Sequence, residues 1–276
     1  MAMSKRQRGQ VFRVVQYGVL LAIIVVLAIV ANWGEIARAF FNLPIAANQV
    51  PAIFATALVN TVIYSLMGFG FGLALALPLA LMKLSSVPPY RWIATVYVEF
   101  FRGVPALLVF ITFGFGVPLA FGLRFDIYST VMLSLGLVGA AYMAETIRAG
   151  IQAVNVGQVE AARSLGMSQA RTMVTIVIPQ AFRIVLPPLT NELILLTKDS
   201  SLIYLLGLAR EQYELTKFGR EALNTSASMT PILFAGLCYL IITIPLSYLS
   251  RYLENRTGGT RVSTPESLEV EAEGAV

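Results

Sequence analysis

Residues 157–168 read Gly157-Gln158-Val159-Glu160-Ala161-Ala162-Arg163-Ser164-Leu165-Gly166-Met167-Ser168, and this polar stretch lies between long hydrophobic runs. Glu160 and Arg163 supply charge, while the alanines leave a surface of small side chains that another protein can approach closely. Gly166 can take a positive φ at little cost because it has no side chain. The stretch therefore predicts a short polar helix that docks onto a partner and ends in a sharp turn at Gly166.

The composition of the chain is typical of a membrane protein with several spans. Of its 276 residues, 57% are hydrophobic and 13% are charged, whereas about 25% of an ordinary soluble domain is charged. The net charge of +5 comes from basic residues scattered at the ends of apolar runs, so it predicts membrane orientation and no nucleic-acid partner. With no histidine and one cysteine, Cys238 in an apolar run, the sequence excludes a His/Cys metal site and a disulfide framework.

Four motifs carry a resemblance to a known family. Glu160-Ala161-Ala162, then Gly166, then Pro179 resemble the EAA loop of ABC importer permeases, the cytoplasmic helix that docks into the ATPase subunit. Three further stretches resemble permeases for polar amino acids, of the histidine/glutamine type. They are Tyr97-Val98-Glu99-Phe100-Phe101-Arg102-Gly103-Val104-Pro105, Ala141-Tyr142-Met143-Ala144-Glu145-Thr146-Ile147-Arg148-Ala149-Gly150-Ile151, and Pro187-Pro188-Leu189-Thr190-Asn191-Glu192 followed by Lys198-Asp199-Ser200-Ser201-Leu202.

The resemblance implies an all-α membrane protein of the type I ABC importer permease kind, with about six transmembrane helices and both termini in the cytoplasm. It implies a multi-pass protein of the bacterial cytoplasmic (inner) membrane that moves polar amino acids into the cell. Its partners would be a dimer of ABC ATPase subunits, a second permease chain (itself or a homologue), an extracytoplasmic substrate-binding protein and the lipid bilayer. The ATPase-coupling residues would be Glu160, Ala161, Ala162, Arg163, Gly166 and Pro179, in a coupling helix at residues 157–170 and the segment after it.

The chain is not expected to be an enzyme or to bind a cofactor itself. It has no Gly-x-x-x-x-Gly-Lys-Ser/Thr loop, so ATP and Mg would bind to the partner ATPase, which would hydrolyse the ATP. Gly68-Phe69-Gly70-Phe71-Gly72 superficially resembles a nucleotide-binding loop, but no strand precedes it. We interpret these glycines as small residues at a contact between helices.

Apolar runs long enough to cross a bilayer divide the chain. A basic cytoplasmic tail (1–13) precedes a first span and an external amphipathic segment (14–51). The permease core follows at 52–250, and residues 251–276 form a cytoplasmic tail that is expected to be disordered. The predicted spans are 14–31, 53–82, 92–121, 127–150, 186–208 and 231–249, with a charged external segment at 209–229.

The fifth span has two alternative boundaries. We start it near Pro187-Pro188, because proline is tolerated in a first helical turn, and interpret residues 171–184 as an interfacial helix. A span over residues 171–196 stays open and would leave Lys198 outside.

Basic residues are unevenly distributed between the two sides of this topology. Those assigned to the cytoplasm are Lys5, Arg6, Arg8, Arg13, Lys83, Arg91, Arg148, Arg163, Arg171, Arg183, Arg251, Arg256 and Arg261, and those outside are Arg38, Arg124, Arg210, Lys217 and Arg220. This asymmetry has the direction of the positive-inside rule. It places the Glu160 segment on the cytoplasmic side, where an ATPase would be.

Polar residues within the predicted spans are candidates for a substrate pathway or gate, because a charge at the centre of a spanning helix costs roughly 2.5–3.5 kcal/mol. They are Glu99, Arg102, Asn191, Glu192, Lys198, Asp199 and Ser200. A carboxylate and a cation in apolar surroundings suit an amino acid, which carries an ammonium and a carboxylate. The alternative is that Glu99 and Arg102, three residues apart, only neutralise each other. For Glu145 and Arg148, nearer the interface, we favour such a structural pair.

Two other functions stay open on sequence grounds. An ion- or proton-coupled secondary transporter of a small polar solute could carry its proton on Glu99 or Asp199. An intramembrane enzyme could use a Ser–Lys pair such as Ser200 and Lys198.

Overall fold

The computed structural model describes residues 5–257, and every regular element in this range is a helix. The α-helices are α1 (Lys5–Val30), α2 (Trp33–Phe40), α3 (Leu43–Ala52), α4 (Val59–Leu84), α5 (Pro88–Gly103), α6 (Ala106–Ile111), α7 (Val117–Phe121), α8 (Ile127–Gln152), α9 (Val156–Ser164), α10 (Gln169–Thr172), α11 (Ile178–Asp199), α12 (Leu215–Ser226) and α13 (Thr230–Arg256). Short π-helical turns are η1 (Ile53–Leu58), η2 (Thr112–Gly116) and η3 (Met173–Val177), and 3-10 turns are η4 (Ser200–Leu205) and η5 (Arg210–Gln212).

Five helical runs among the described residues are long and apolar enough to cross a membrane: Gly9–Val30, Trp33–Leu84, Ile127–Gln152, Gln169–Leu205 and Thr230–Arg256. A bent pair, Pro88–Gly103 with Ala106–Phe121, gives a sixth when its two halves are counted as one span. This confirms the predicted all-helical membrane fold with about six spans. The acidic end of the predicted tail, residues 258–276, lies outside the described residues.

The third span is broken, which corrects the expectation of one straight helix over residues 92–121. Its two halves meet at an angle of 101°. Val104 and Pro105 at the break have extended backbone, with ψ of 131° and 132°. Proline lacks an N–H and disfavours helical geometry in the residue before it, so the helix ends at Gly103 and restarts after Pro105.

The fifth span starts earlier than predicted. Helix α11 begins at Ile178, and residues 169–205 form one helical run that contains both Pro187 and Pro188. The predicted start at Pro187 is therefore wrong, and the interfacial helix is part of the same run; the alternative start near Arg171 is closer. Pro187 and Pro188 lack an N–H, so the carbonyls four residues earlier, of Arg183 and Ile184, lose their intrahelical donors, yet the run stays helical. The Ser250 hydroxyl of α13 donates to the Pro187 carbonyl at 3.3 Å and ties the two helices together there.

Helices α4 and α8 form the central pair of the bundle. A Cβ added to Gly72 would lie 3.0 Å from the Gly136 carbonyl oxygen, and one added to Gly136 would lie 3.1 Å from that of Gly68. The two backbones therefore touch, which confirms the predicted role at a helix contact for Gly68 and Gly72. The prediction is wrong for Gly70, where an added Cβ would meet no atom within 4 Å. The buried side chains of Leu135 and Met143 fill the same interface.

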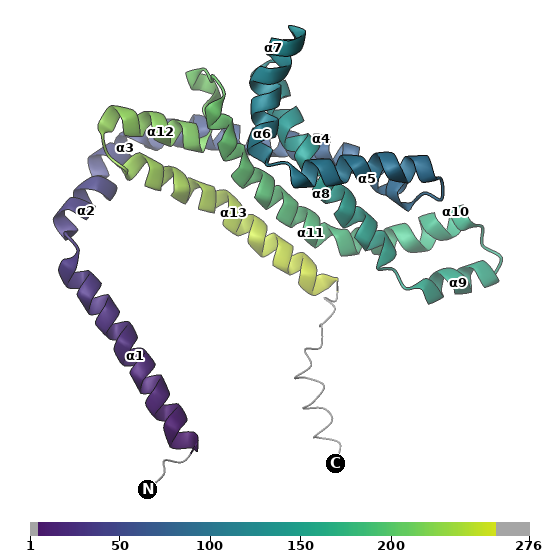
Figure 1. Ribbon diagram of the computed structural model, residues 1–276, viewed down its shortest axis with the longest axis horizontal. Coiled ribbons are helices and arrows are strands. Elements are labelled where there is room, and N and C mark those ends of the chain that lie inside the picture. The colour runs from purple at the N-terminus through teal and green to yellow at the C-terminus, as the bar shows by residue number, and fades with distance from the viewer. Residues whose placement is uncertain (1–4, 258–276) are drawn as a thin grey trace.

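The bundle has two distinct ends (Figure 1). Helices α9 and α10 lie together at one end, and α2, α3 and α12 lie at the other. Helix α1 extends away from the body, and its apolar stretch over residues 9–30 buries none of its residues within the chain.

Candidate functional site

The polar stretch at residues 157–168 and the residues just after it form two short helices joined by a turn. Asn155 caps α9, its side chain accepting a hydrogen bond from the Gly157 N–H at 2.8 Å, and Ser168 caps α10. Gly166 between them has a φ of +83°, which confirms the predicted turn. The Arg163 guanidinium closes the turn by donating to the Met167 carbonyl at 2.7 Å. Residues 157–170 are thus a helix, a turn and the start of a second helix.

One face of α9 is attached to the body and the other is open. Ala162 is buried, and Val154 beside the helix packs with Val177 and Ala181 of the segment leading into and along α11. The open face carries Glu160, Ala161 and Arg163. Leu165 at the turn is 85% exposed.

Two long helices meet this segment. Helix α8 ends at Gln152 and leads directly into α9. Helix α11 contacts α9 through the Gln180 amide, which donates to the Gln158 side-chain oxygen at 2.6 Å. Pro179 lies exposed in the first turn of α11. The α9 segment is therefore joined to both α8 and α11.

A pocket of about 400 Å³ lies farther along the same two helices. Three of the predicted pathway residues line it together: Arg102, Glu192 and Asp199. The remaining lining comes from the break between α5 and α6, from α8 and from α11, namely Gly103, Val104, Pro105, Ala106, Val138, Gly139, Tyr142, Leu195 and Leu196. One cation and two carboxylates thus face a largely apolar cavity.

Helix α8 holds the pocket rim in place. The Arg102 guanidinium carbon lies 5.6 Å from the centre of the Tyr142 ring, a cation–π contact, and the Tyr142 hydroxyl donates to the Arg102 carbonyl at 3.4 Å. One turn earlier on α5, the Tyr97 hydroxyl donates to the Leu137 carbonyl at 2.9 Å. The break in the third span is therefore what turns Arg102 and its carbonyl toward α8.

The other predicted pathway residues lie outside the pocket lining. Glu99, Asn191 and Lys198 are exposed on their helices. Within the described residues no ion pair joins Glu99 to Arg102, which stacks on Tyr142 instead. Ser200 is buried, and its hydroxyl donates to the Thr197 carbonyl at 2.7 Å. The α-helix changes to a 3-10 helix at this point, so the predicted interruption at 198–201 coincides with a change of backbone geometry.

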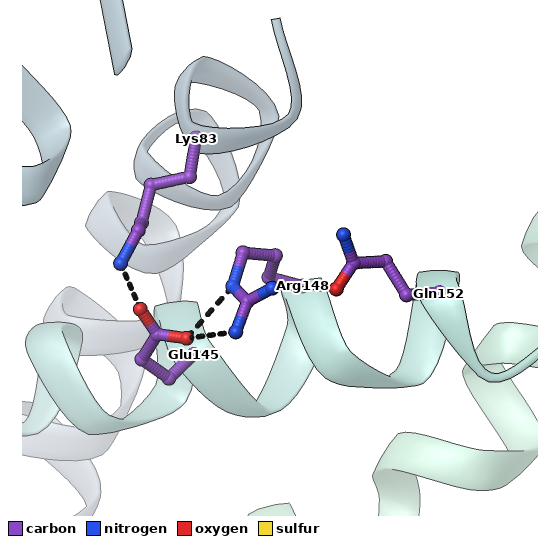
Figure 2. A network of polar contacts seen from close by, with 4 residues as sticks. All are labelled: Lys83, Glu145, Arg148 and Gln152. Carbon is purple, nitrogen blue, oxygen red and sulfur yellow. Dashed lines mark hydrogen bonds and ion pairs between the residues drawn. The ribbon is translucent and has the colours of Figure 1, made fainter. Parts of the chain in front are cut away.

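A network of charged side chains joins α4 to α8 (Figure 2). Lys83, in the last turn of α4, forms an ion pair with Glu145 of α8, and Arg148 binds the same carboxylate at 2.7 Å and continues to Gln152. The Glu145–Arg148 pair is as predicted. Lys83 was missed as a partner because it is 62 residues away in the sequence and no local spacing connects it to Glu145.

A fully buried carboxylate at the opposite end of the bundle was also missed. Glu214 is fully buried as the N-cap of α12, where it accepts the N–H groups of Thr216 and Lys217 at 2.6 Å each and the Tyr239 hydroxyl at 2.9 Å. Burial raises the pKa of the Glu214 carboxyl to about 7. Its sequence setting, a charged segment expected to be external, gave no sign of burial. The only local signal is an acidic residue just before an amphipathic helix.

Residues 68–259 match the family model described as "Binding-protein-dependent transport system inner membrane component". Among curated proteins, the chain is 36% identical to the probable glutamine ABC transporter permease protein GlnM of Bacillus subtilis, over 74% of this chain and 93% of that relative. It is 40% identical to the glutamate/aspartate import permease protein GltK of Escherichia coli, over 65% and 82%. It is 35% identical to the arginine transport system permease protein ArtQ of B. subtilis, over 64% and 80%.

Solved structures give the same result for the fold. A chain from a crystal structure described as an amino acid ABC transporter with histidines superposes with a TM-score of 0.70 at 32% identity, covering 76% of this chain and 96% of that one. A chain of the MetNI methionine ABC transporter in an inward-facing conformation superposes with a TM-score of 0.62 at 16% identity, which supports the fold alone.

Proposed function

Because this chain belongs to the family of binding-protein-dependent transport system inner membrane components, we propose that it is the membrane-spanning subunit of an ATP-driven importer of polar amino acids. The similar proteins are described as permeases for glutamine, arginine and glutamate/aspartate, and these substrates are all polar amino acids. The family is that of the non-catalytic membrane subunit. ATP and Mg would bind to a partner ATPase and be used there.

The observation that carries the proposal is that the same two helices join the α9 segment to the pocket. Helix α8 lines the pocket with Tyr142 and ends beside α9, and α11 contacts α9 at Gln180 and lines the pocket with Glu192 and Asp199. A partner that moves α9 would thereby move two walls of the pocket. This is the connection that an importer powered by a separate ATPase requires.

The open face of α9 is the proposed ATPase-docking surface. Glu160 and Arg163 offer charge there, Ala161 and the exposed Leu165 offer close apolar contact, and the turn at Gly166 fixes the angle between α9 and α10. We infer that two permease chains assemble, this chain with a second copy of itself or with a homologue. Closure of the ATPase dimer on binding ATP then pushes the open face of α9 in each. Alternation between outward-open and inward-open states follows from that movement.

The pocket suits the backbone groups that all amino acids share. The guanidinium of Arg102 can pair with an α-carboxylate, and the carboxylates of Glu192 and Asp199 can receive an α-ammonium. The apolar lining strengthens both contacts by lowering the local dielectric constant. We propose that an external binding protein delivers the amino acid to this site, with Asn191, Lys198, Ser200 and Glu99 along or near the route.

ATP-dependent uptake tests this function. Vesicles that hold this chain, its ATPase and its binding protein are supplied with labelled polar amino acids, and Glu160→Lys, which reverses a charge on the open face of α9, is the control. The proposal expects uptake that requires ATP and is lost in Glu160→Lys. Uptake that persists without ATP and collapses with an uncoupler would instead support an ion- or proton-coupled transporter, which no contact in the described residues favours.

A further inference from the structure

The charge network in Figure 2 lies between the pocket and the α9 segment. On α8, Glu145 follows Tyr142 of the pocket by three residues, and Arg148 and Gln152 lead on toward α9. Lys83 is at the end of α4, and the short connection after it leads into α5, which ends at the Arg102 rim. Movement of α9 reaches α8 directly, and Glu145 is the point at which that movement could pass from α8 to α4 and then to α5.

The contact between α4 and α8 along the rest of its length is built from small and apolar groups. Gly68, Gly72 and Gly136 bring the two backbones together, and no side chain at these three positions fixes the helices lengthwise. Side chains of the facing helix pack against these glycines, Leu135 at Gly68 and Phe71 at Gly136, by apolar contacts without fixed direction. The Lys83–Glu145 ion pair adds a directional bond at the end of this interface. Among ion pairs between described residues, only Lys83–Glu145 joins two different helices; the others lie within α8 and within α12.

The two cations of the network, Lys83 and Arg148, differ in how much they depend on Glu145. The side chains of Lys83 and Glu145 are 12% and 18% exposed, whereas Arg148 is 31% exposed and also bonds Gln152. Loss of Glu145 would therefore leave a mostly buried ammonium without a carboxylate, while Arg148 would keep a partner. The interaction between helices depends on Glu145 more than the interaction within α8 does.

We propose that Glu145 is a positioning residue for transport: it fixes the lengthwise register of α4 against α8, so that movement of α9 reaches α5 and the Arg102 rim as well as α8. The inference rests on the proposed importer function. Without Glu145, the ATPase would still turn over, but the rim formed by α5 would follow α8 less completely. The amount of amino acid moved per ATP hydrolysed would therefore fall.

The first test measures uptake and ATP hydrolysis together in proteoliposomes that contain the full complex. For Glu145→Gln the inference expects a ratio of uptake to hydrolysis that falls roughly tenfold, the scale of a typical coupling energy. The matched control is Glu221→Gln, which removes an ion pair that lies within α12 and is half exposed, and leaves the ratio unchanged. The double variant Lys83→Met/Glu145→Gln leaves no ammonium unpaired. It should assemble with the ATPase and still have the low ratio.

The second test restores the connection by other means. Lys83→Cys/Glu145→Cys is joined with a short bis-methanethiosulfonate cross-linker, because the original side chains together reach farther than a disulfide. The native Cys238 is buried, and a Cys238→Ala background controls for it. The unlinked protein should have the low ratio, and linking should raise it. A wild-type ratio before linking, or no gain after it, would overturn the inference.

Failure of the inference is distinguishable from failure of the proposed function. Wild-type vesicles without ATP-driven uptake would overturn the proposed function, and this inference with it. ATP-driven uptake in the wild type, together with an unchanged ratio in the Glu145 variants, would overturn this inference alone.

Discussion

Glu145 and Glu214 are carboxylates toward opposite ends of the helix bundle, and they differ in burial and in the charge of their partners: Glu145 is partly buried and Glu214 is fully buried. Glu145 is bound by the cations Lys83 and Arg148. Glu214 is bound by two backbone N–H groups and the Tyr239 hydroxyl, all of them neutral. Neutral donors stabilise a buried anion less than cations do. The difference teaches that burial and the charge of the partners act together: Glu145 is held by two cations, whereas Glu214 is fully buried among neutral donors and can titrate near neutral pH.

The Glu214 end is nonetheless well ordered by hydrogen bonds from α4. Asn60 donates to the carbonyls of Glu211 and Tyr213 at 2.8 and 3.0 Å, and Tyr64 donates to that of Gln212 at 3.0 Å. Arg220 of α12 stacks on Tyr204 of η4 at 4.9 Å, which connects α12 to the turn that follows Asp199 of the pocket. Changes at Glu214 therefore act on the part of the chain next to the pocket, as changes at Glu145 do from the other side.

The largest loss of stability is expected when the ion pairs of Glu145 are removed. Glu145→Leu leaves Lys83 mostly buried and unpaired, so it should destabilise the folded chain by about 3 kcal/mol. Thermal unfolding of the detergent-purified complex would measure this as a lowered Tm. A Tm equal to that of the wild type would mean that the network contributes no stability. The charged partners of Glu145 would then give it no advantage over Glu214.

Measuring stability over a series of pH values should reveal the titration of Glu214. The pKa of Glu214 is about 7 in the folded chain against an ordinary value of 4.5, so folding strengthens its hold on the proton. Stability contributed by the protonated group is complete below pH 4.5 and is lost as pH rises through 7. Between pH 5 and 8 the loss should be about 2 kcal/mol.

The matched variant for this pH series is Glu214→Gln, which keeps the shape and cannot ionise. The stability difference between wild type and variant should move in favour of the variant as pH rises. A difference that is constant between pH 5 and 8 would contradict the raised pKa.

A smaller effect is expected when one neutral donor is removed. Tyr239→Phe deletes the hydroxyl that donates to Glu214 and that also lies 3.1 Å from the Thr216 hydroxyl. The loss should be about 1 kcal/mol. The loss should grow as pH rises, because the ionised carboxylate needs the donor more. Protection factors of the α12 amides, which correct for the intrinsic rise of exchange with pH, would measure it in wild type and variant. A difference between the two proteins that is the same at pH 5 and 8 would argue against a titrating Glu214.

The smallest effect is expected at an exposed pair on the same helix. Lys217 and Glu221 lie 3.6 Å apart, and Glu221 is half exposed. Glu221→Gln should change stability by about 0.3 kcal/mol. A Tm shift as large as that of Glu145→Leu would show that burial does not separate these pairs.

Sequence reasoning identified the fold and the kinds of residue at the site, but not how they meet. Arg102, Glu192 and Asp199 stood out as charges inside apolar runs, yet only tertiary packing places them around one pocket. The break at Val104-Pro105 could have been predicted from the sequence, since a residue before proline avoids helical geometry. The continuous path of α11 through Pro187 and Pro188 could not, because local sequence rules favour a helix boundary at proline.

The carboxylates Glu145 and Glu214 illustrate the same limit. Glu145 was paired correctly with Arg148, since a spacing of three residues is a local property of a helix. Its partner Lys83 comes from another helix, and the burial of Glu214 is produced by packing of α4 and α13 around the start of α12. Periodicity along one segment contains no information on either.

The measurement that tests the central claim most directly is uptake per ATP hydrolysed in a Gly166→Val complex. Gly166 has a φ of +83°, and a Cβ there would meet no atom within 4 Å, so valine would act through the backbone and not through crowding. Gly166→Asn is the matched control, because asparagine tolerates positive φ. The account predicts that ATP hydrolysis continues in Gly166→Val while uptake per ATP falls at least roughly fivefold, and that Gly166→Asn stays close to the wild type. Wild-type uptake per ATP in Gly166→Val would contradict the claim that the α9 segment drives the pocket.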